Sequence, residues 1–336
     1  MQLPQHSRFR NHVRVLMLLA SLACLAGFTV LFFKLDVAAI SASLSSLRRI
    51  WVWLFALELT RLACEVWTTR SLLGMAGGHL PTLRLLRGQF LGQACDVILP
   101  LGRTSAETAK AVLYAGHVGA PVAGAVATTM QLAVLAANCS WVLASYLPSQ
   151  RLGVPGAASA GLLTYIAATF SIVLAVVLFA AAPWARRASQ RFPLLHASLE
   201  RLAQLLLSTP HALLLALSSQ LLGRIVQATQ LALIVSTLGA HIAPAHLLTL
   251  EAVYIVGSAL GEFVPAQLGA ADAALIVVAP ALGLTAVAAF STTLAMRAVQ
   301  LIVAAAAALA SLGMWWIEER SSDSLRRDAA QLLPSE

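Results

Sequence analysis

Three charged side chains, Glu58, Arg61 and Glu65, interrupt an apolar stretch of this sequence. An ionisable group at the centre of a bilayer costs about 2.5–3.5 kcal/mol on insertion scales, so it indicates a ligand, a partner or a polar pathway. Their spacing of i, i+3 and i+7 places all three on one face of a helix. Two interpretations follow: a self-paired patch lining a helix bundle, or part of a polar route through it.

A second group of charges surrounds a chain break at Pro100 and Gly102, within residues 88–116. The charged residues of this segment are Asp96, Arg103, Glu107 and Lys110. The run Thr104-Ser-Ala-Glu107 has the spacing of a capping box, in which a hydroxyl and a carboxylate accept hydrogen bonds from the first N–H groups of a helix. Helix capping and ligand binding are both open for Glu107.

A third group repeats this pattern around Pro265 and Gly269, within residues 247–282. Its charged residues are Glu251, Glu262 and Asp272. Gly269-Ala-Ala-Asp272 has the same capping spacing, with glycine at the cap. If the helices after both breaks begin near the membrane midplane, their N–H groups and positive dipole ends could bind a lipid phosphate there.

Two further arginines, Arg224 and Arg297, lie within long apolar stretches. Together with Arg103 and Lys110 they could add charge-assisted hydrogen bonds to a phosphate. For each cation taken alone, the alternative is a side chain that is ion-paired or that extends to the membrane surface.

The elements that must position these residues are membrane helices. Of 336 residues, 59% are hydrophobic and 11% are charged, and the mean hydropathy is +0.82. So few charges cannot cover a water-soluble globule, which excludes a soluble enzyme. The apolar runs are continuous rather than alternating, so we predict an all-α, polytopic membrane protein.

We predict about six full spans and two Pro-broken re-entrant hairpins, which makes about eight helical segments. The predicted spans are 13–33, 51–73, 121–147, 160–182, 211–238 and 285–317. The first run is too long for a signal peptide, so we expect a retained helix. Each half of a hairpin is only about 12–15 residues long, too short to cross the hydrocarbon core.

Basic residues set the expected orientation, because they favour the cytoplasmic side. We expect both termini, the loop at 70–87 and the polar tail 318–336 inside, in an inner (plasma) membrane. Residues 184–208, with four arginines, predict one interfacial helix on that face. Residues 1–317 then form a single membrane domain in which one hairpin enters from each side.

This arrangement predicts an inverted repeat of about 50–147 and about 211–317. A shift of 165 residues pairs Gly92 with Gly257, Pro100 with Pro265, and Glu107 with Asp272. Inverted repeats with broken helices that meet near the midplane are a recurrent plan of transporters. The pairs Gly88/Gly92 and Gly257/Gly261 predict close helix packing.

The sequence contains no motif typical of other functional classes. The net charge of +8 accompanies no basic stripe interleaved with aromatics, and the four cysteines have no paired spacing. No GxxxxGK[ST], HExxH or GxSxG motif is present. We therefore expect no nucleic-acid partner, no metal, no cofactor, no catalytic residue and no nucleotide-driven step within this chain.

Residues 90–110 (FLGQACDVILPLGRTSAETAK) and 257–273 (GSALGEFVPAQLGAADA), followed by Arg297, resemble the paired signatures of the flippase-like family, also called the lysylphosphatidylglycerol synthase transmembrane region. Ala106 and Lys110 replace the usual glycine and arginine of the first signature, and Asp272 replaces the glutamate of the second. The resemblance implies an inner-membrane protein that moves a polar lipid between leaflets. The aminoacyl transferase domain of the lysyl-lipid enzymes is not in this sequence, so lipid aminoacylation is not expected.

Our leading hypothesis is a flippase-like transporter without its own nucleotide drive, which binds an anionic phospholipid or a polyprenyl-phosphate-linked lipid and could work beside a lipid-biosynthesis enzyme. Arg103, Lys110 and Arg297 are predicted to hold the phosphate, with hinges at the two breaks. The predicted substrate-binding residues are Arg61, Arg103, Glu107, Lys110, Arg224, Glu262, Asp272 and Arg297. The alternatives are a lipid-modifying membrane enzyme that uses Glu107, Glu262 or Asp272 as acid or base, and a membrane scaffold for envelope lipid synthesis.

Overall fold

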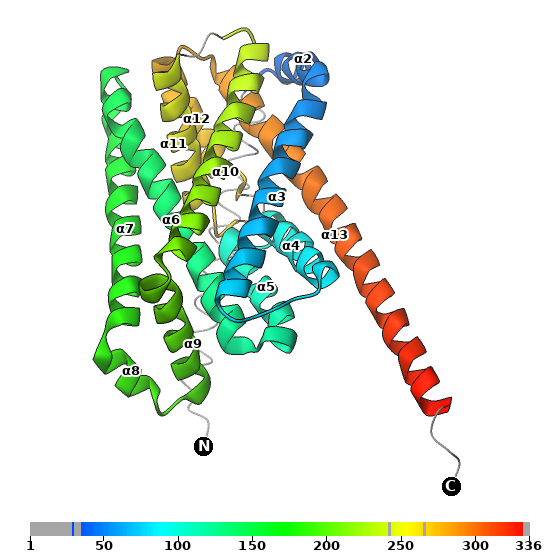
Figure 1. The fold of residues 1–336 in the computed structure, drawn as a ribbon. Helices are drawn as coiled ribbons and strands as arrows, with labels where there is room; N and C mark the ends of the chain where they lie inside the picture. Colours follow the sequence, from blue (N-terminus) through cyan, green and yellow to red (C-terminus); the bar gives the residue numbers. More distant parts are fainter. Residues whose placement is uncertain (1–28, 30–34, 241–242, 265–266, 332–336) are drawn as a thin grey trace, which may run out of the picture.

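The chain folds as a bundle of helices (Figure 1). The computed structural model describes residues 29, 35–240, 243–264 and 267–331. Over these residues there are twelve α-helices, α2 to α13, and no strand, which confirms the predicted all-α class. The predicted span 13–33 and the predicted hinge residue Pro265 lie outside the described residues.

The helices fall into two groups separated by a connecting segment. The first group is α2 (Val37–Ser46), α3 (Trp51–Met75), α4 (Thr82–Ile98), α5 (Gly102–Val118) and α6 (Ala120–Arg151). The connecting segment is α7 (Gly156–Ala181), α8 (Pro183–Ser189), α9 (Pro193–Ala203) and a π-helical turn (Gln204–Ser208). The second group is α10 (Pro210–Thr237), α11 (Pro244–Leu260), α12 (Ala270–Val278) and α13 (Ala286–Gln331).

Four helices are long and apolar enough to cross a membrane: α6, α7, α10 and the Ala286–Arg320 part of α13. Each coincides with one of the predicted spans. The 25-residue helix α3 is also long enough, but Glu58, Arg61 and Glu65 lower its apolar character. These charges are buried or half-buried inside the bundle, so α3 matches the predicted span 51–73 in position while it carries polar groups inward.

Two helical hairpins lie between the long helices. The first is α4–α5, of 17 residues each. The second is α11, also of 17 residues, with α12 of nine residues and a 3-10 turn at Ala279–Leu282. At 1.5 Å per residue, 17 residues span about 25 Å, longer than predicted but still short of the roughly 30 Å hydrocarbon core. In Figure 1 the second hairpin occupies the upper half of the bundle and the first the lower half.

The two halves share one plan of packing. Helices α3 and α10 begin 159 residues apart, α4 and α11 162, α5 and α12 168, and α6 and α13 166. Helix α3 packs against α10, α4 packs against α13, and α11 packs against α6. Figure 1 shows α3 and α10 running in opposite directions. The repeated units are α3–α6 and α10–α13. The second helix of each unit therefore packs on the fourth helix of the other unit, as an inverted repeat requires.

Glycines let the hairpin helices approach closely, as predicted. A Cβ on Gly88 would lie 2.3 Å from the Tyr114 ring, and a Cβ on Gly257 would lie 2.7 Å from the Ala271 Cα. In both hairpins the glycines of the entering helix thus contact the returning helix. The hairpins are tightly packed pairs rather than loose loops.

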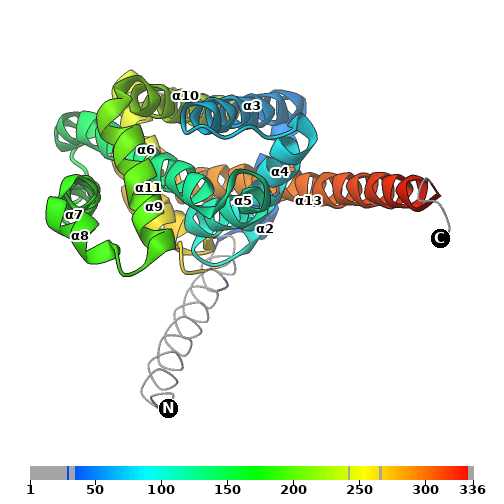
Figure 2. The same cartoon turned by 60° about the horizontal axis from the view of Figure 1, so that its bottom comes forward.

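The prediction of a single interfacial helix over 184–208 is wrong. The segment forms two short helices, α8 and α9, with a turn between them and a π-helical turn after them. Pro193 explains the break, because proline disfavours the helical conformation of the residue before it, and Phe192 is extended at φ −127° and ψ 90°. Figure 2 shows α8 and α9 at one end of the bundle, where Trp184 and Phe192 are exposed.

Candidate functional site

A cavity of about 360 Å³ lies inside the bundle, between the two hairpins and helices α3, α6, α7 and α10. Polar and charged side chains from both halves of the chain line it. The charged residues of the lining are Glu58, Arg61, Asp96, Arg103, Arg224 and Glu262. The cavity is therefore a charged, partly open site between helices of a membrane protein, which is where a functional site is expected.

The breaks of the two hairpins contact one another beside this cavity. The backbone N–H of Leu101 donates to the carbonyl of Glu262 at 2.7 Å. Leu101 and Gly102 have positive φ values of 67° and 34°, and a Cβ on Gly102 would lie 3.4 Å from the Asp96 carbonyl and 3.5 Å from the Gln267 side chain. We call residues 99–102 and the described residues 261–264 and 267–269 the hairpin tips. Because one tip belongs to each half of the chain, the contact joins the two repeats at the centre of the molecule.

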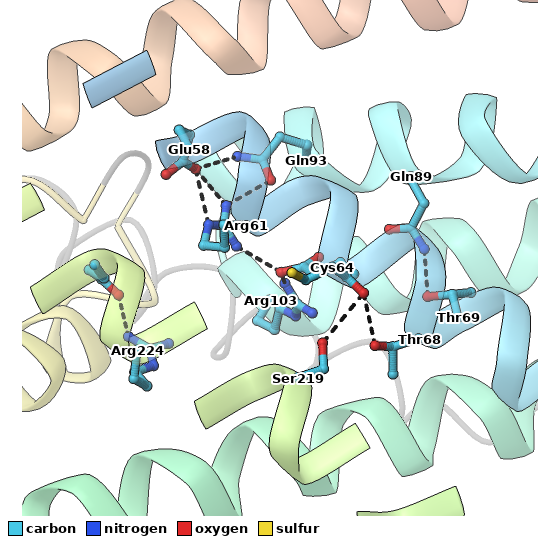
Figure 3. A network of polar contacts seen from close by, with 12 residues as sticks. Glu58, Arg61, Cys64, Thr68, Thr69, Gln89, Gln93, Arg103, Ser219 and Arg224 are labelled. Atoms are coloured by element: carbon cyan, nitrogen blue, oxygen red, sulfur yellow. Dashed lines mark hydrogen bonds and ion pairs between the residues drawn. The ribbon is translucent and has the colours of Figure 1, made fainter. Parts of the chain in front are cut away.

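The charged face of α3 is self-paired, as the first interpretation predicted, and its Glu58 and Arg61 also line the cavity (Figure 3). Arg61 lies 2.6 Å from a Glu58 oxygen and 2.7 Å from a Glu65 oxygen. The same guanidinium donates to Gln93 of α4 at 3.0 Å. The i, i+3 and i+4 spacing brings these groups together on one helix face, and α4 completes the network.

Arg103 connects the first hairpin to α3. One of its nitrogens lies 2.8 Å from Glu65, and another lies 3.2 Å from Glu107 one turn along α5. Its Nε is buried and has no hydrogen-bond partner among the described residues. Arg103 therefore holds the charged face of α3 while it keeps a donor for a ligand in the cavity.

Glu107 and Lys110 form a buried ion pair of 2.6 Å within α5. Neither residue belongs to the cavity lining. The capping interpretation of Glu107 is wrong, because α5 begins at Gly102 and no side chain caps its first turn. The left-handed conformation of Leu101 starts the helix earlier than the capping spacing predicted, so Glu107 lies within the helix and pairs with cations instead.

Asp272 has the capping role that its spacing predicted. The N–H of Gly269 donates to Asp272 at 2.9 Å, and Gly269 has φ +90°, a conformation that favours glycine. Arg297 of α13 lies 2.8 Å from the same carboxylate oxygen and donates to the Gln267 carbonyl at 2.8 Å. Asp272 and Arg297 thus fix the second tip to α13, outside the cavity lining.

Arg224 of α10 extends into the cavity. It donates to Gln227 at 2.5 Å and lies 3.5 Å from the buried Glu251 of α11. Of the eight predicted binding residues, four line the cavity: Arg61, Arg103, Arg224 and Glu262. The other four, Glu107, Lys110, Asp272 and Arg297, lie behind the lining as ion pairs within and between helices.

Sequence reasoning missed most of the uncharged polar lining. Side-chain amides reach the cavity from four helices and one tip: Gln93, Gln131, Asn138, Gln220, Gln227, Gln267 and Gln300. Several buried polar atoms of the lining, among them Gln131 Oε1, Gln220 Nε2 and Ser258 Oγ, have no hydrogen-bond partner among the described residues. Amides within apolar spans were the available signal, because an amide is costly in hydrocarbon unless it meets a partner.

Asp96 also lines the cavity, although we did not include it among the predicted binding residues. With Asp96, the lining contains three arginines and three carboxylates. Each arginine already has a carboxylate partner. Within the described residues no group of three or more His, Cys, Asp or Glu side chains could hold a metal ion. The site therefore offers both donors and acceptors to a polar ligand rather than an excess of positive charge.

The fold and the site define a polytopic helical membrane protein, built as an inverted repeat around a buried polar cavity. The family model described as "Lysylphosphatidylglycerol synthase TM region" matches residues 15–308. The chain therefore belongs to this family. No curated protein and no solved structure matches the chain.

Proposed function

We propose that the protein is a flippase-like transporter that moves a polar lipid headgroup between the leaflets of the cell inner membrane. The observation that carries the proposal is the contact of two oppositely directed hairpin tips beside a partly open, charged cavity. A headgroup crossing the bilayer needs a polar environment near the midplane, and this cavity provides one. The family description refers to the membrane region of a lipid synthase, which supports a lipid as the ligand.

The cavity suggests how a phosphate-containing headgroup would be held. Arg61, Arg103 and Arg224 line it, and the Nε of Arg103 and the Nε2 of Gln220 are buried donors without a partner among the described residues. These groups replace the predicted set of Arg103, Lys110 and Arg297, because Lys110 and Arg297 do not line the cavity. In the proposed mechanism the hairpins open the cavity to one leaflet and then to the other, while the acyl chains remain in lipid.

Leaflet exchange of labelled lipids in vesicles containing the purified protein tests this proposal. The labels are an anionic phospholipid, a zwitterionic phospholipid and a polyprenyl phosphate, each followed by reduction of the label in the outer leaflet. We expect faster exchange for at least one lipid than in protein-free vesicles. Chemical analysis of the recovered lipid separates transport from the alternative, an enzyme that modifies the headgroup.

Arg103→Gln is the informative variant, because it removes the charge and the free Nε donor from the lining. We expect exchange to fall by about 10- to 150-fold, as for the loss of one charge-assisted contact of roughly 1.5–3 kcal/mol. Arg151→Gln is the matched control, since Arg151 is exposed at the end of α6. Equal exchange rates for wild type, Arg103→Gln and protein-free vesicles with every lipid would contradict the proposal.

A further inference from the structure

Two carboxylates of the cavity lining form no ion pair within 4 Å among the described residues. Asp96 lies near the end of α4 and Glu262 lies in the second tip, and both line the cavity. Neither forms an ion pair or a side-chain hydrogen bond with any described residue, whereas every arginine of the lining is paired. An unpaired carboxylate in a low-dielectric site tends either to take up a proton or to bind a cation.

The two carboxylates belong to the two halves of the tip contact. Asp96 packs against Gly102 in the first tip: a Cβ on Gly102 would lie 3.6 Å from its Oδ1. Glu262 accepts the hydrogen bond from Leu101 through its backbone carbonyl. Both carboxylates therefore lie at the tip contact and line the same cavity, so two negative charges there oppose the contact and the loss of one favours it.

Arg61, Arg103 and Lys110 lie close enough to act on the Asp96 charge, although each pairs with another carboxylate, and the surroundings do not suit a metal ion. The nearby charged and titratable groups of the neighbouring helices are Glu58, Arg61 and Glu65 of α3, Arg103 and Lys110 of α5, Arg224 of α10 and Tyr165 of α7. The cations among them are already paired with other carboxylates. Within the described part of the chain, no third acidic or histidine side chain joins the pair in a set that could hold a metal ion.

An independent observation indicates that the cavity binds water or a polar ligand. Gln220 is 93% buried, its relative exposure being 7%, and it lines the same cavity. Its Nε2 has no hydrogen-bond partner among the described residues. A buried amide donor without a partner is a cost that water or a ligand oxygen would remove. The cavity is therefore built for polar occupants, and water entering it would bring protons to the carboxylates.

We propose that Asp96 and Glu262 form a proton-binding pair that couples proton movement to lipid exchange. This inference rests on the proposed function. One carboxylate takes a proton from water on one side of the membrane and becomes a neutral carboxylic acid, which removes the repulsion and lets the tips meet. When the cavity faces the other side, the acid returns the proton to water as the carboxylate re-forms, and the tips separate. No other reactant is consumed.

Infrared spectroscopy of the purified protein in lipid nanodiscs tests the proton site without any transport assay. We expect a carbonyl band of protonated carboxylic acid that titrates with pH and is reduced in both Asp96→Asn and Glu262→Gln. Glu200→Gln is the matched control, because Glu200 is exposed on α9. An unchanged band in both variants would overturn the proposal, and thermal unfolding identifies any variant that fails to fold.

Leaflet exchange under a pH gradient tests the coupling. A gradient of one pH unit changes the equilibrium leaflet ratio by up to about tenfold for one proton per lipid. We expect such a shift for wild type and none for Asp96→Asn or Glu262→Gln. Wild-type exchange that ignores the pH gradient, or follows a sodium gradient at constant pH, would overturn the coupling and leave the proposed function intact. A complete lack of exchange contradicts the proposed function, and the infrared band alone then decides the proton site.

Discussion

The two hairpins have the same shape but neutralise their charges in different ways. In α4–α5, Glu107 finds its cations within the hairpin, at Arg103 and Lys110. In α11–α12 the charged side chains are all acidic, and the cations come from the long helices. Arg224 of α10 lies near Glu251, and Arg297 of α13 pairs with Asp272.

This difference shows which hairpin depends on other helices to compensate its charges. The second hairpin is bound to α10 and α13 by ion pairs, so its position requires those helices. The first hairpin keeps part of its charge balance even if its contacts with α3 change. Ion pairs also hold the first hairpin, through Arg103 to α3 and through Arg84 and Arg87 to α13, so the two hairpins differ in the source of their charge compensation and not in whether they are attached.

The largest expected effect is for Arg297→Leu. Asp272 is fully buried and would lose its only ion-pair partner among the described residues. We expect a loss of about 3–5 kcal/mol in the free energy of unfolding, the usual cost of leaving a buried charge unpaired. Unfolding by dodecyl sulfate in mixed micelles measures it. Partial rescue by Asp272→Asn in the same chain would confirm that the cost comes from the unpaired charge.

Lys110→Met should lower the free energy of unfolding by less, about 2 kcal/mol. This value is typical of leaving one buried polar group without one of its partners. Arg103 still lies 3.2 Å from Glu107 and continues to compensate it. The same mixed-micelle unfolding compares the two variants directly. A loss for Lys110→Met as large as that for Arg297→Leu would contradict the contrast between the hairpins.

Gly257→Ala should lower the free energy of unfolding by about 1–2 kcal/mol, which is in the range for overpacking a close contact. The new Cβ would lie 2.7 Å from the Ala271 Cα, which belongs to backbone and cannot rotate away. Gly92→Ala is the matched variant in the first hairpin, where the nearest atoms are flexible Lys110 methylenes at 3.0 Å. We expect a smaller loss of thermal stability for Gly92→Ala, and equal losses would show that the two hairpins tolerate overpacking alike.

The smallest expected effect is for Glu318→Gln. Glu318 of α13 lies 3.2 Å from Arg84 and 2.5 Å from Arg87, at the start of the first hairpin. These pairs are partly open to solvent, so we expect a loss below about 1 kcal/mol that shrinks as salt increases. Thermal unfolding at two salt concentrations measures it. A loss above that of Lys110→Met would mean that this outer contact, rather than the internal pairs, holds the first hairpin.

The sequence predicted the hairpins because their cause is local. Pro100 and the glycines at 102 and 269 mark breaks, and the short helices on each side could not cross a bilayer. The capping of α12 by Asp272 was also a local pattern. The repeat was visible because the same local features recur after 165 residues.

The partners of the charged residues could not be predicted in the same way. Whether Lys110 or Arg297 faces the cavity depends on the rotation of each helix and on its packing against helices far away in the chain. The amide lining was missed because its members lie singly on separate helices, from Gln93 to Gln300. A single amide in an apolar span carries no information on its neighbours until the bundle is assembled.

The central claim is that the two hairpin tips meet, and cysteine cross-linking in native membranes tests it most directly. Leu101→Cys and Glu262→Cys are combined in a chain without other cysteines, with a protease site inserted in the turn between α8 and α9. Because the Leu101 N–H lies 2.7 Å from the Glu262 carbonyl, we predict that oxidation keeps the two proteolytic fragments joined. A Leu101→Cys and Trp316→Cys pair is the control, because Trp316 is exposed on the outer part of α13 in the second fragment, and its fragments should separate. Separation of the Leu101–Glu262 pair under the same oxidation would contradict the account.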